Sequence, residues 1–223
     1  MPSFPNATLV RLPDRPGQSE ISLSVHELGK GPAVVFCHGF PELAYSWRYQ
    51  LPAIADAGFR AIAADQRGYG ASSRPERIED YGLTELAGDM VGLLDALEIE
   101  RAVFVGHDWG GMVAWAMPVL FPERTAGVVG VCTPYISMGT TELMRALVQG
   151  DDDRMYILWF QKPGVAEAVL DSRARLVFER LLRGGIPLET IAERMMADGK
   201  LDMNPFRRLD ELEPMGEPIV SEE

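Results

Sequence analysis

The stretch of sequence that decides the fold is GHDWGG, residues 106–111. It follows the apolar run RAVFV of residues 101–105 and precedes the pattern MVAWAM of residues 112–117. A short apolar run bounded by glycine predicts a buried strand, and the pattern after it predicts a helix. The two elements meet at Asp108 in a turn so sharp that its apex residue is expected at positive φ, where a residue other than glycine is strained.

Glycines surround Asp108 at the positions where side chains would obstruct such a turn. Gly106 stands two residues before the apex, and Gly110 and Gly111 stand two and three residues after it. A strand, a glycine-framed turn and a helix form a nucleophile elbow. Because the apex is a carboxylate and not a serine, it would attack an alkyl carbon and leave an alkyl ester on the protein. This predicts chemistry on epoxides or alkyl halides and excludes a serine esterase.

The rest of the first 134 residues alternates between strand and helix patterns. Such alternation indicates βαβ units and an α/β fold whose sheet is mostly parallel. The first two strands alternate apolar and polar residues and should pair antiparallel around a proline-rich turn. The helix over residues 83–97 carries an apolar stripe, with Thr84 as its expected N-cap. The predicted strands are 6–12, 21–28, 33–37, 60–64, 101–105 and 126–131, and the predicted helices include 45–57 and 83–97.

The pattern changes after Pro134. Between residues 141 and 203 the sequence shows helical patterns and no convincing strand. The chain is therefore predicted to contain an α/β core over residues 1–134 and a partial helical lid over residues 135–223.

The composition indicates an ordinary globular protein. Hydrophobic residues make up 47% and charged residues 24% of the 223 residues, and the net charge is −12. There is no basic stripe to meet phosphates, so no nucleic-acid partner is expected. No apolar run approaches the ~18 residues that a membrane-spanning helix needs. No signal peptide is visible at the start, and the predicted location is cytoplasmic.

The cysteines and histidines indicate no metal centre. Cys37 and Cys132 lie inside apolar runs and are expected to be buried free thiols. The three histidines, His26, His38 and His107, do not stand at ligand spacing. We therefore expect neither a metal ion nor another cofactor.

Four motifs occur together in one order along the chain. They read HGFPE at residues 38–42, DQRGYGAS at 65–72, the GHDWGG elbow, and YILWFQKPGVAE at 156–167. In this order they resemble the motifs of the α/β-hydrolase superfamily, and most closely those of its epoxide hydrolases. The resemblance implies an α/β-hydrolase core with a helical cap.

The resemblance also implies roles for individual residues. Asp108 would be the nucleophile, and Tyr156 would assist ring opening as the proton donor. The Phe40–Pro41 peptide bond would be cis, which proline makes feasible. The backbone N–H groups of Phe40 and Trp109 would form an oxyanion hole that also aims the Asp108 carboxylate at the substrate. An ordinary aromatic packed on the core remains the alternative for Tyr156.

The expected substrate pocket is apolar. The side chains expected to line it are Phe40, Pro41, Trp109, Trp159 and Phe160. Core packing is the alternative role for Phe40 and Trp109.

Four polar residues in the motifs are expected to act as scaffold. His38 and His107 flank the motifs as loop supports, and Asp65 and Arg67 form a structural ion pair or anchor a turn.

The chain departs from the family's pattern in its second half. The family has a late histidine base with an acid that orients it, and a second cap tyrosine, but here the last histidine is His107 and the last tyrosine is Tyr156. We therefore expect a chain truncated at its C-terminus. The strand at 126–131 would then be an exposed hydrophobic edge through which the chain associates with itself.

Three functions remain open from the sequence. The first is an epoxide hydrolase that acts on a small apolar epoxide and completes only the first half of the reaction. The second is a haloalkane or fluoroacetate dehalogenase, for which the Trp109 indole could serve as a halide donor. The third is an inactive, truncated relative.

Overall fold

The computed structural model describes residues 4–135, 141–197 and 199–218. The chain divides into two compact units, Met1–Tyr135 and Ile136–Glu223, which we name the core unit and the helical unit. The division lies one residue from the boundary predicted after residue 134. The assignment of the second unit as a lid stays a prediction.

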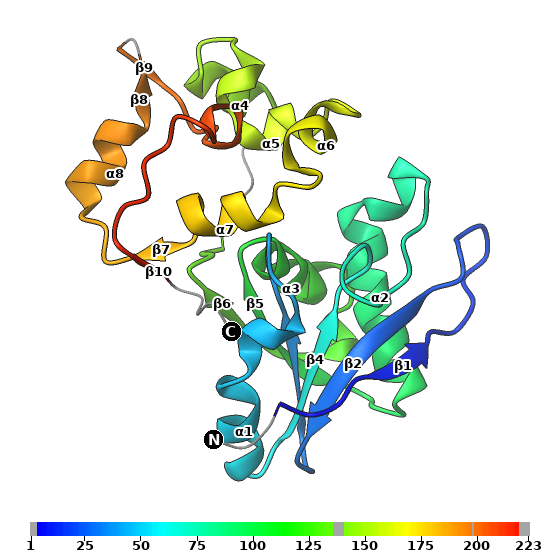
Figure 1. The fold of residues 1–223 in the computed structure, drawn as a ribbon. Coiled ribbons are helices and arrows are strands. Elements are labelled where there is room, and N and C mark those ends of the chain that lie inside the picture. The colour runs from blue at the N-terminus through cyan, green and yellow to red at the C-terminus, as the bar shows by residue number, and fades with distance from the viewer. Residues whose placement is uncertain (1–3, 136–140, 198, 219–223) are drawn as a thin grey trace. The chain divides into compact units, whose positions relative to one another are not determined.

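The core unit is built on a six-stranded sheet in the order β1-β2-β4-β3-β5-β6 (Figure 1). The first three strands in this order pair antiparallel, and β4, β3, β5 and β6 pair parallel. The predicted α/β class with a mostly parallel sheet is therefore confirmed. The strands are β1 Thr8–Arg11, β2 Ser22–Leu28, β3 Ala33–Cys37, β4 Arg60–Asp65, β5 Ala102–His107 and β6 Thr125–Val131.

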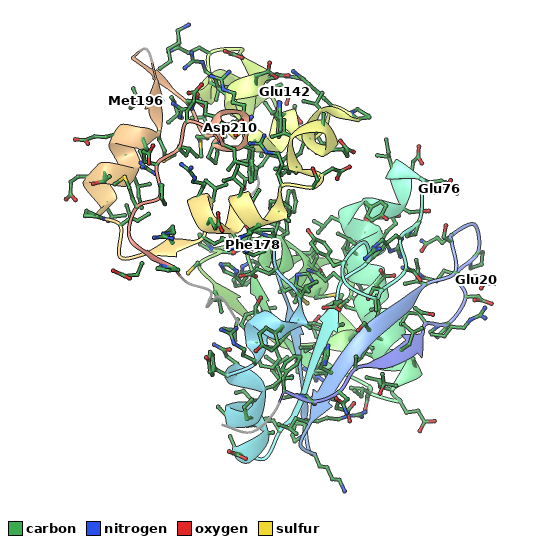
Figure 2. The ribbon with its side chains drawn as sticks, in the orientation of Figure 1. Glu20, Glu76, Glu142, Phe178, Met196 and Asp210 are labelled. Atoms are coloured by element: carbon green, nitrogen blue, oxygen red, sulfur yellow. The ribbon has the colours of Figure 1, made fainter. Side chains whose placement is uncertain are left out.

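Helices cover both faces of this sheet. Figure 1 shows α1 on one side and α2 and α3 on the other, and two separate apolar clusters lie on these faces. Charged side chains such as Glu20 and Glu76 project from the loops (Figure 2). The helices are α1 Gln50–Asp56, α2 Leu83–Ala96 and α3 Trp109–Leu120, with the 3-10 helices η1 Ala44–Trp47, η2 Ile78–Tyr81 and η3 Pro122–Arg124.

The central strands bring the two decisive loops to one edge of the sheet. All five residues of β3 are buried, as the continuous apolar run predicted. β3 and β5 pair in parallel, with Cys37 opposite Gly106. Since parallel strands end at the same edge, the loop after Cys37 and the turn after His107 start beside each other.

The structure corrects two predicted helix starts. The helix predicted over residues 45–57 is divided into η1 and α1, because Pro52 has no N–H for the carbonyl of residue 48 and fits only in a first turn. Thr84 is not the N-cap of α2. Gly82 takes that place, and its carbonyl accepts the N–H of Leu86 at 3.0 Å.

The two cysteines also differ from each other. Both are free, but only Cys37 is buried, whereas Cys132 is exposed at the end of β6. The apolar run around Cys132 belongs to the outer strand of the described sheet, so it does not enclose the thiol. Burial raises the pKa of the Cys37 thiol to about 12.

The helical unit has a small apolar cluster of its own around Val148, Met155 and Leu158. The prediction of no strand in this region is wrong, because two two-stranded ladders, β7–β10 and β8–β9, occur there. Each strand is two residues long, too short for a period-two pattern to register. The helices are α4 Thr141–Leu147, α5 Tyr156–Trp159, α6 Val165–Leu170, α7 Ala174–Leu181 and α8 Leu188–Arg194, with η4 Asp152–Arg154 and η5 Phe206–Arg208. The strands are β7 Arg183–Gly184, β8 Met196–Ala197, β9 Lys200–Leu201 and β10 Glu217–Pro218.

None of the helices in the described ranges is long and apolar enough to cross a membrane.

Candidate active site

Asp108 stands at the apex between β5 and α3. Its φ is 51° and its ψ is −123°, so the predicted positive φ is confirmed. A residue other than glycine holds such a conformation only when its surroundings impose it. The carbonyl of Asp108 accepts the N–H of Gly111 at 2.9 Å, which closes the first turn of α3.

The three glycines of the elbow leave no room for a side chain. A Cβ on Gly106 would lie 2.2 Å from the carbonyl oxygen of Gly110, and one on Gly110 would lie 2.1 Å from that of Cys37. At Gly111 it would lie 2.5 Å from the side chain of Thr133. The strand, the turn and the helix can therefore approach each other only with glycine at these positions.

The loop after β3 delivers a backbone donor to Asp108. The Phe40–Pro41 peptide bond is cis, as predicted, and the Phe40 N–H donates to Asp108 Oδ1 at 3.0 Å. Gly39 permits this approach, because a Cβ there would lie 2.5 Å from the Cβ of Asp108. Trp109 begins α3, so its N–H is among the first-turn donors that lack a partner within the helix. Its side chain is 37% exposed.

Glu42 ties this loop to the elbow. Its Oε2 accepts the Gly39 N–H at 2.9 Å and lies 3.0 Å from Nδ1 of His107. One carboxylate thus joins the residue before Phe40 to the residue before Asp108. This geometry agrees with the scaffolding role expected for His107, and the sequence reasoning did not assign a role to Glu42.

His38 lies fully buried beneath the same loop. Its Nδ1 is 2.9 Å from the Gly39 carbonyl oxygen, and its Nε2 is 3.0 Å from the Gln66 backbone nitrogen. The first contact needs a proton on Nδ1, and the second needs a free lone pair on Nε2, so both together require the neutral ring. Burial lowers the pKa of His38, which also favours this neutral form.

Asp65 and Arg67 do not pair with each other, so the ion pair considered from the sequence is wrong. Asp65 Oδ1 accepts the Ala44 N–H at 2.9 Å, which makes it an anchor for the following turn. Arg67 is fully buried and binds both carboxylate oxygens of Asp89 on α2. Arg15 also donates to Asp89, at 2.6 Å. An acid within the apolar stripe of residues 83–97 was the signal that could have identified Asp89.

The remaining predicted residues belong to the helical unit. Tyr156 begins α5, and its ring packs edge-on against Phe160 and Phe206, with centroids 5.7 and 6.0 Å apart. Trp159 is buried and contacts Phe160 at a centroid distance of 5.6 Å. Sequence reasoning missed Phe206, which comes from a segment 50 residues later. The pocket predicted from Phe40, Pro41, Trp109, Trp159 and Phe160 spans both units and stays a prediction.

Within the described residues, no group of three or more His, Cys, Asp or Glu side chains is arranged to hold a metal ion.

Comparison with known proteins identifies the same fold and the same group of relatives. Residues 32–181 match the family model described as the alpha/beta hydrolase fold. Epoxide hydrolase A of Mycobacterium tuberculosis is 44% identical over 214 residues, which cover 91% of this chain and 64% of that protein. Bifunctional epoxide hydrolase 2 of Sus scrofa is 45% identical over 163 residues, which cover 73% of this chain and 29% of that protein. This chain thus spans less than two thirds of the length of either relative.

A solved structure agrees with this assignment. The crystal structure of epoxide hydrolase A from Mycobacterium thermoresistibile superposes with a TM-score of 0.81 at 41% identity, covering 97% of this chain and 67% of that one. With its aspartate elbow and its cis-proline loop, the chain belongs to the α/β-hydrolase family and, within that family, to the epoxide hydrolases.

Proposed function

We propose that this protein opens small apolar epoxides through a covalent alkyl ester on Asp108. The observation that carries the proposal is the hydrogen bond from the Phe40 N–H to Asp108 Oδ1, at 3.0 Å. It fixes a carboxylate at a strained, exposed turn and leaves its other oxygen available for attack. A hydrogen bond that holds a nucleophile in one orientation lowers the entropy cost of reaching the transition state.

The first half of the reaction forms the ester. An oxygen of the Asp108 carboxylate bonds to an epoxide carbon, and the carbon–oxygen bond of the ring breaks with its electron pair moving to the ring oxygen. We propose that the Tyr156 hydroxyl gives its proton to that alkoxide. The apolar side chains of Phe40, Pro41, Trp109, Trp159 and Phe160 would line the substrate pocket.

The second half releases a diol. Water adds to the carbonyl carbon of the ester, and negative charge develops on the oxygen held by the Phe40 N–H, with the Trp109 N–H as the proposed second donor. The alkyl oxygen then leaves with a proton, and the Asp108 carboxylate is restored. This sequence contains no histidine after His107 to activate that water. For this chain we therefore propose that the ester accumulates, and we place its action in the cytoplasm.

The test is the mass of the protein after incubation with styrene oxide. We expect one added epoxide mass per chain, mapped to Asp108 by peptide sequencing. Asp108→Asn should show no addition, whereas Asp95→Asn, which changes a half-exposed carboxylate on α2, should react like the wild type. In the same assay Tyr156→Phe should form the ester about 10²-fold more slowly, because a general acid contributes at least that much.

Three results would overturn the proposal. Adduct on residues other than Asp108 would show non-specific alkylation, and no adduct at all would indicate an inactive relative. Halide released from 1-chlorobutane without any reaction with styrene oxide would identify a dehalogenase.

A further inference from the structure

Tyr69 stands at the tip of a rigid turn between β4 and η2. Gly68 and Gly70 flank it with φ values of 91° and 51°. A Cβ on Gly70 would lie 2.1 Å from Asp65 Oδ2, so the turn lies tightly against its own anchor. The buried contacts of Arg67 with Asp89 hold the other side of the turn. The position of the Tyr69 side chain is therefore fixed by its surroundings.

The Tyr69 ring packs against the loop that orients the nucleophile. It meets the ring of His38 edge-on, with centroids 4.8 Å apart and an interplanar angle of 79°. His38 in turn contacts the Gly39 carbonyl, and Phe40 donates to Asp108. Tyr69 thus supports this loop from the side of β4.

The hydroxyl of Tyr69 lies within the field of two carboxylates. Burial raises the pKa of Tyr69 to about 12, and the negative charges of Asp108 and Glu42 contribute to this rise. The phenol therefore keeps its proton at neutral pH and can donate a hydrogen bond. In the described parts of the chain the hydroxyl has no hydrogen-bond partner, yet it is not one of the buried polar atoms left without a partner. Water can therefore reach it.

Resting on the function proposed above, we propose that Tyr69 is a positioning residue for the nucleophile: its ring supports the His38–Phe40 loop, and its hydroxyl donates through one bound water to the Asp108 carboxyl group. A water-mediated hydrogen bond is nearly as favourable in enthalpy as a direct one. The contact stabilises negative charge on Asp108, in the free carboxylate and again in the oxyanion of ester hydrolysis. It is weaker while Asp108 is a neutral ester.

The pH dependence of ester formation tests the role of the hydroxyl. Tyr69→Phe keeps the ring and removes only the hydroxyl. A donor to the charged form favours ionisation, so its loss should move the acidic limb of the rate of adduct formation with styrene oxide to higher pH. On that limb the rate should fall about tenfold, the scale of one hydrogen bond to a charged group. The rate on the neutral plateau should change little.

Tyr81→Phe is the matched control. The Tyr81 hydroxyl donates to the Pro75 carbonyl at 2.8 Å, and its ring packs on Gly68 of the same turn. Asp108 is not among the charges that act on Tyr81. The pH profile of this variant should match that of the wild type.

Nuclear magnetic resonance gives a second readout that does not require a reaction. In protein labelled with ¹³C at tyrosine Cζ, the Tyr69 signal is identified by its loss in Tyr69→Phe. We expect this signal to move as the pH is lowered through the acidic limb. In Asp108→Asn that movement should disappear, and the Tyr81 signal should not follow it in either protein.

The outcomes separate this inference from the proposed function. Wild-type protein without any adduct would overturn the function, and the resonance experiment would still decide the hydroxyl contact. Adduct formation with the same pH profile in Tyr69→Phe and the wild type would overturn the inference. An equal fall in rate at every pH would overturn it too, because it would show that Tyr69 only stabilises the fold.

Discussion

At the scale of single residues, the site depends on side chains that are absent. Asp108 holds a φ of 51° because Gly106 and Gly110 allow β5, the turn and α3 to come together. Gly39 does the same for the loop that carries the Phe40 N–H. The strain at one residue is thus maintained by the packing of its neighbours, and changing a neighbour should release it.

Gly106→Ala tests this dependence. The added Cβ would lie 2.2 Å from the backbone oxygen of Gly110, so β5 and α3 must separate. We expect the free energy of unfolding to fall by about 1–3 kcal/mol, the usual cost of overpacking, together with loss of adduct formation at Asp108. Urea unfolding measures the first and mass spectrometry the second. Gly127→Ala is the control, because its Cβ would lie an ordinary 3.7 Å from Val103. Equal stability of the two variants would contradict the argument.

At the scale of elements, a buried ion pair joins the turn after β4 to α2. Arg67 binds both oxygens of Asp89, and Arg15 from the segment after β1 adds a third contact. Burial raises the pKa of Asp89, and the two guanidinium groups oppose that rise. The pair therefore fixes the turn that carries Tyr69 only while both partners are present.

Arg67→Met should expose the cost of the unpaired carboxylate. Breaking a buried pair by removing one partner costs about 3–5 kcal/mol at neutral pH. Without Arg67 the folded-state pKa of Asp89 rises further above its unfolded value. A group shifted in this way loses its contribution to stability as pH rises and regains it as pH falls. The difference from the wild type should therefore shrink when urea unfolding is repeated towards pH 4.5.

Two further variants check this interpretation. The double change Arg67→Met with Asp89→Leu should recover much of the lost stability, because no buried charge remains unpaired. Arg77→Met removes an exposed partner of Glu79 and should change the unfolding free energy by less than about 0.5 kcal/mol. A stability loss in Arg67→Met that is the same at every pH would argue against an unpaired Asp89 charge.

At the scale of the whole molecule, the described sheet ends at β6. Its only partner strand among the described residues is β5, and Val129 is 48% exposed. An apolar strand with unpaired backbone donors and acceptors is a template for another strand. The self-association predicted from the sequence therefore remains our expectation for this chain in solution.

Val129→Lys should reduce that association. A charge on an edge strand disfavours edge-to-edge pairing, so the weight-average mass in sedimentation equilibrium should move towards that of one chain. Val119→Lys, at an exposed valine on α3, is the matched control and should behave like the wild type. A wild-type chain that is monomeric at every concentration measured would refute the expectation.

The sequence by itself determined the elements that local patterns specify. The alternation of apolar runs predicted the α/β class, and GHDWGG predicted the elbow with Asp108 at positive φ. Such signals are carried by neighbouring residues, because strand period, glycine and proline act over a few positions. The two-residue strands of the helical unit gave no such signal.

Tertiary structure alone decided which distant groups meet. Phe40 reaches Asp108 across 68 residues only through the register of β3 and β5. Arg67 could have paired with Asp65, two positions away, but packing against α2 gave it Asp89. The Tyr69 ring met His38 in the same way. No local pattern encodes these pairings, because each depends on how buried surfaces from separate segments fit together.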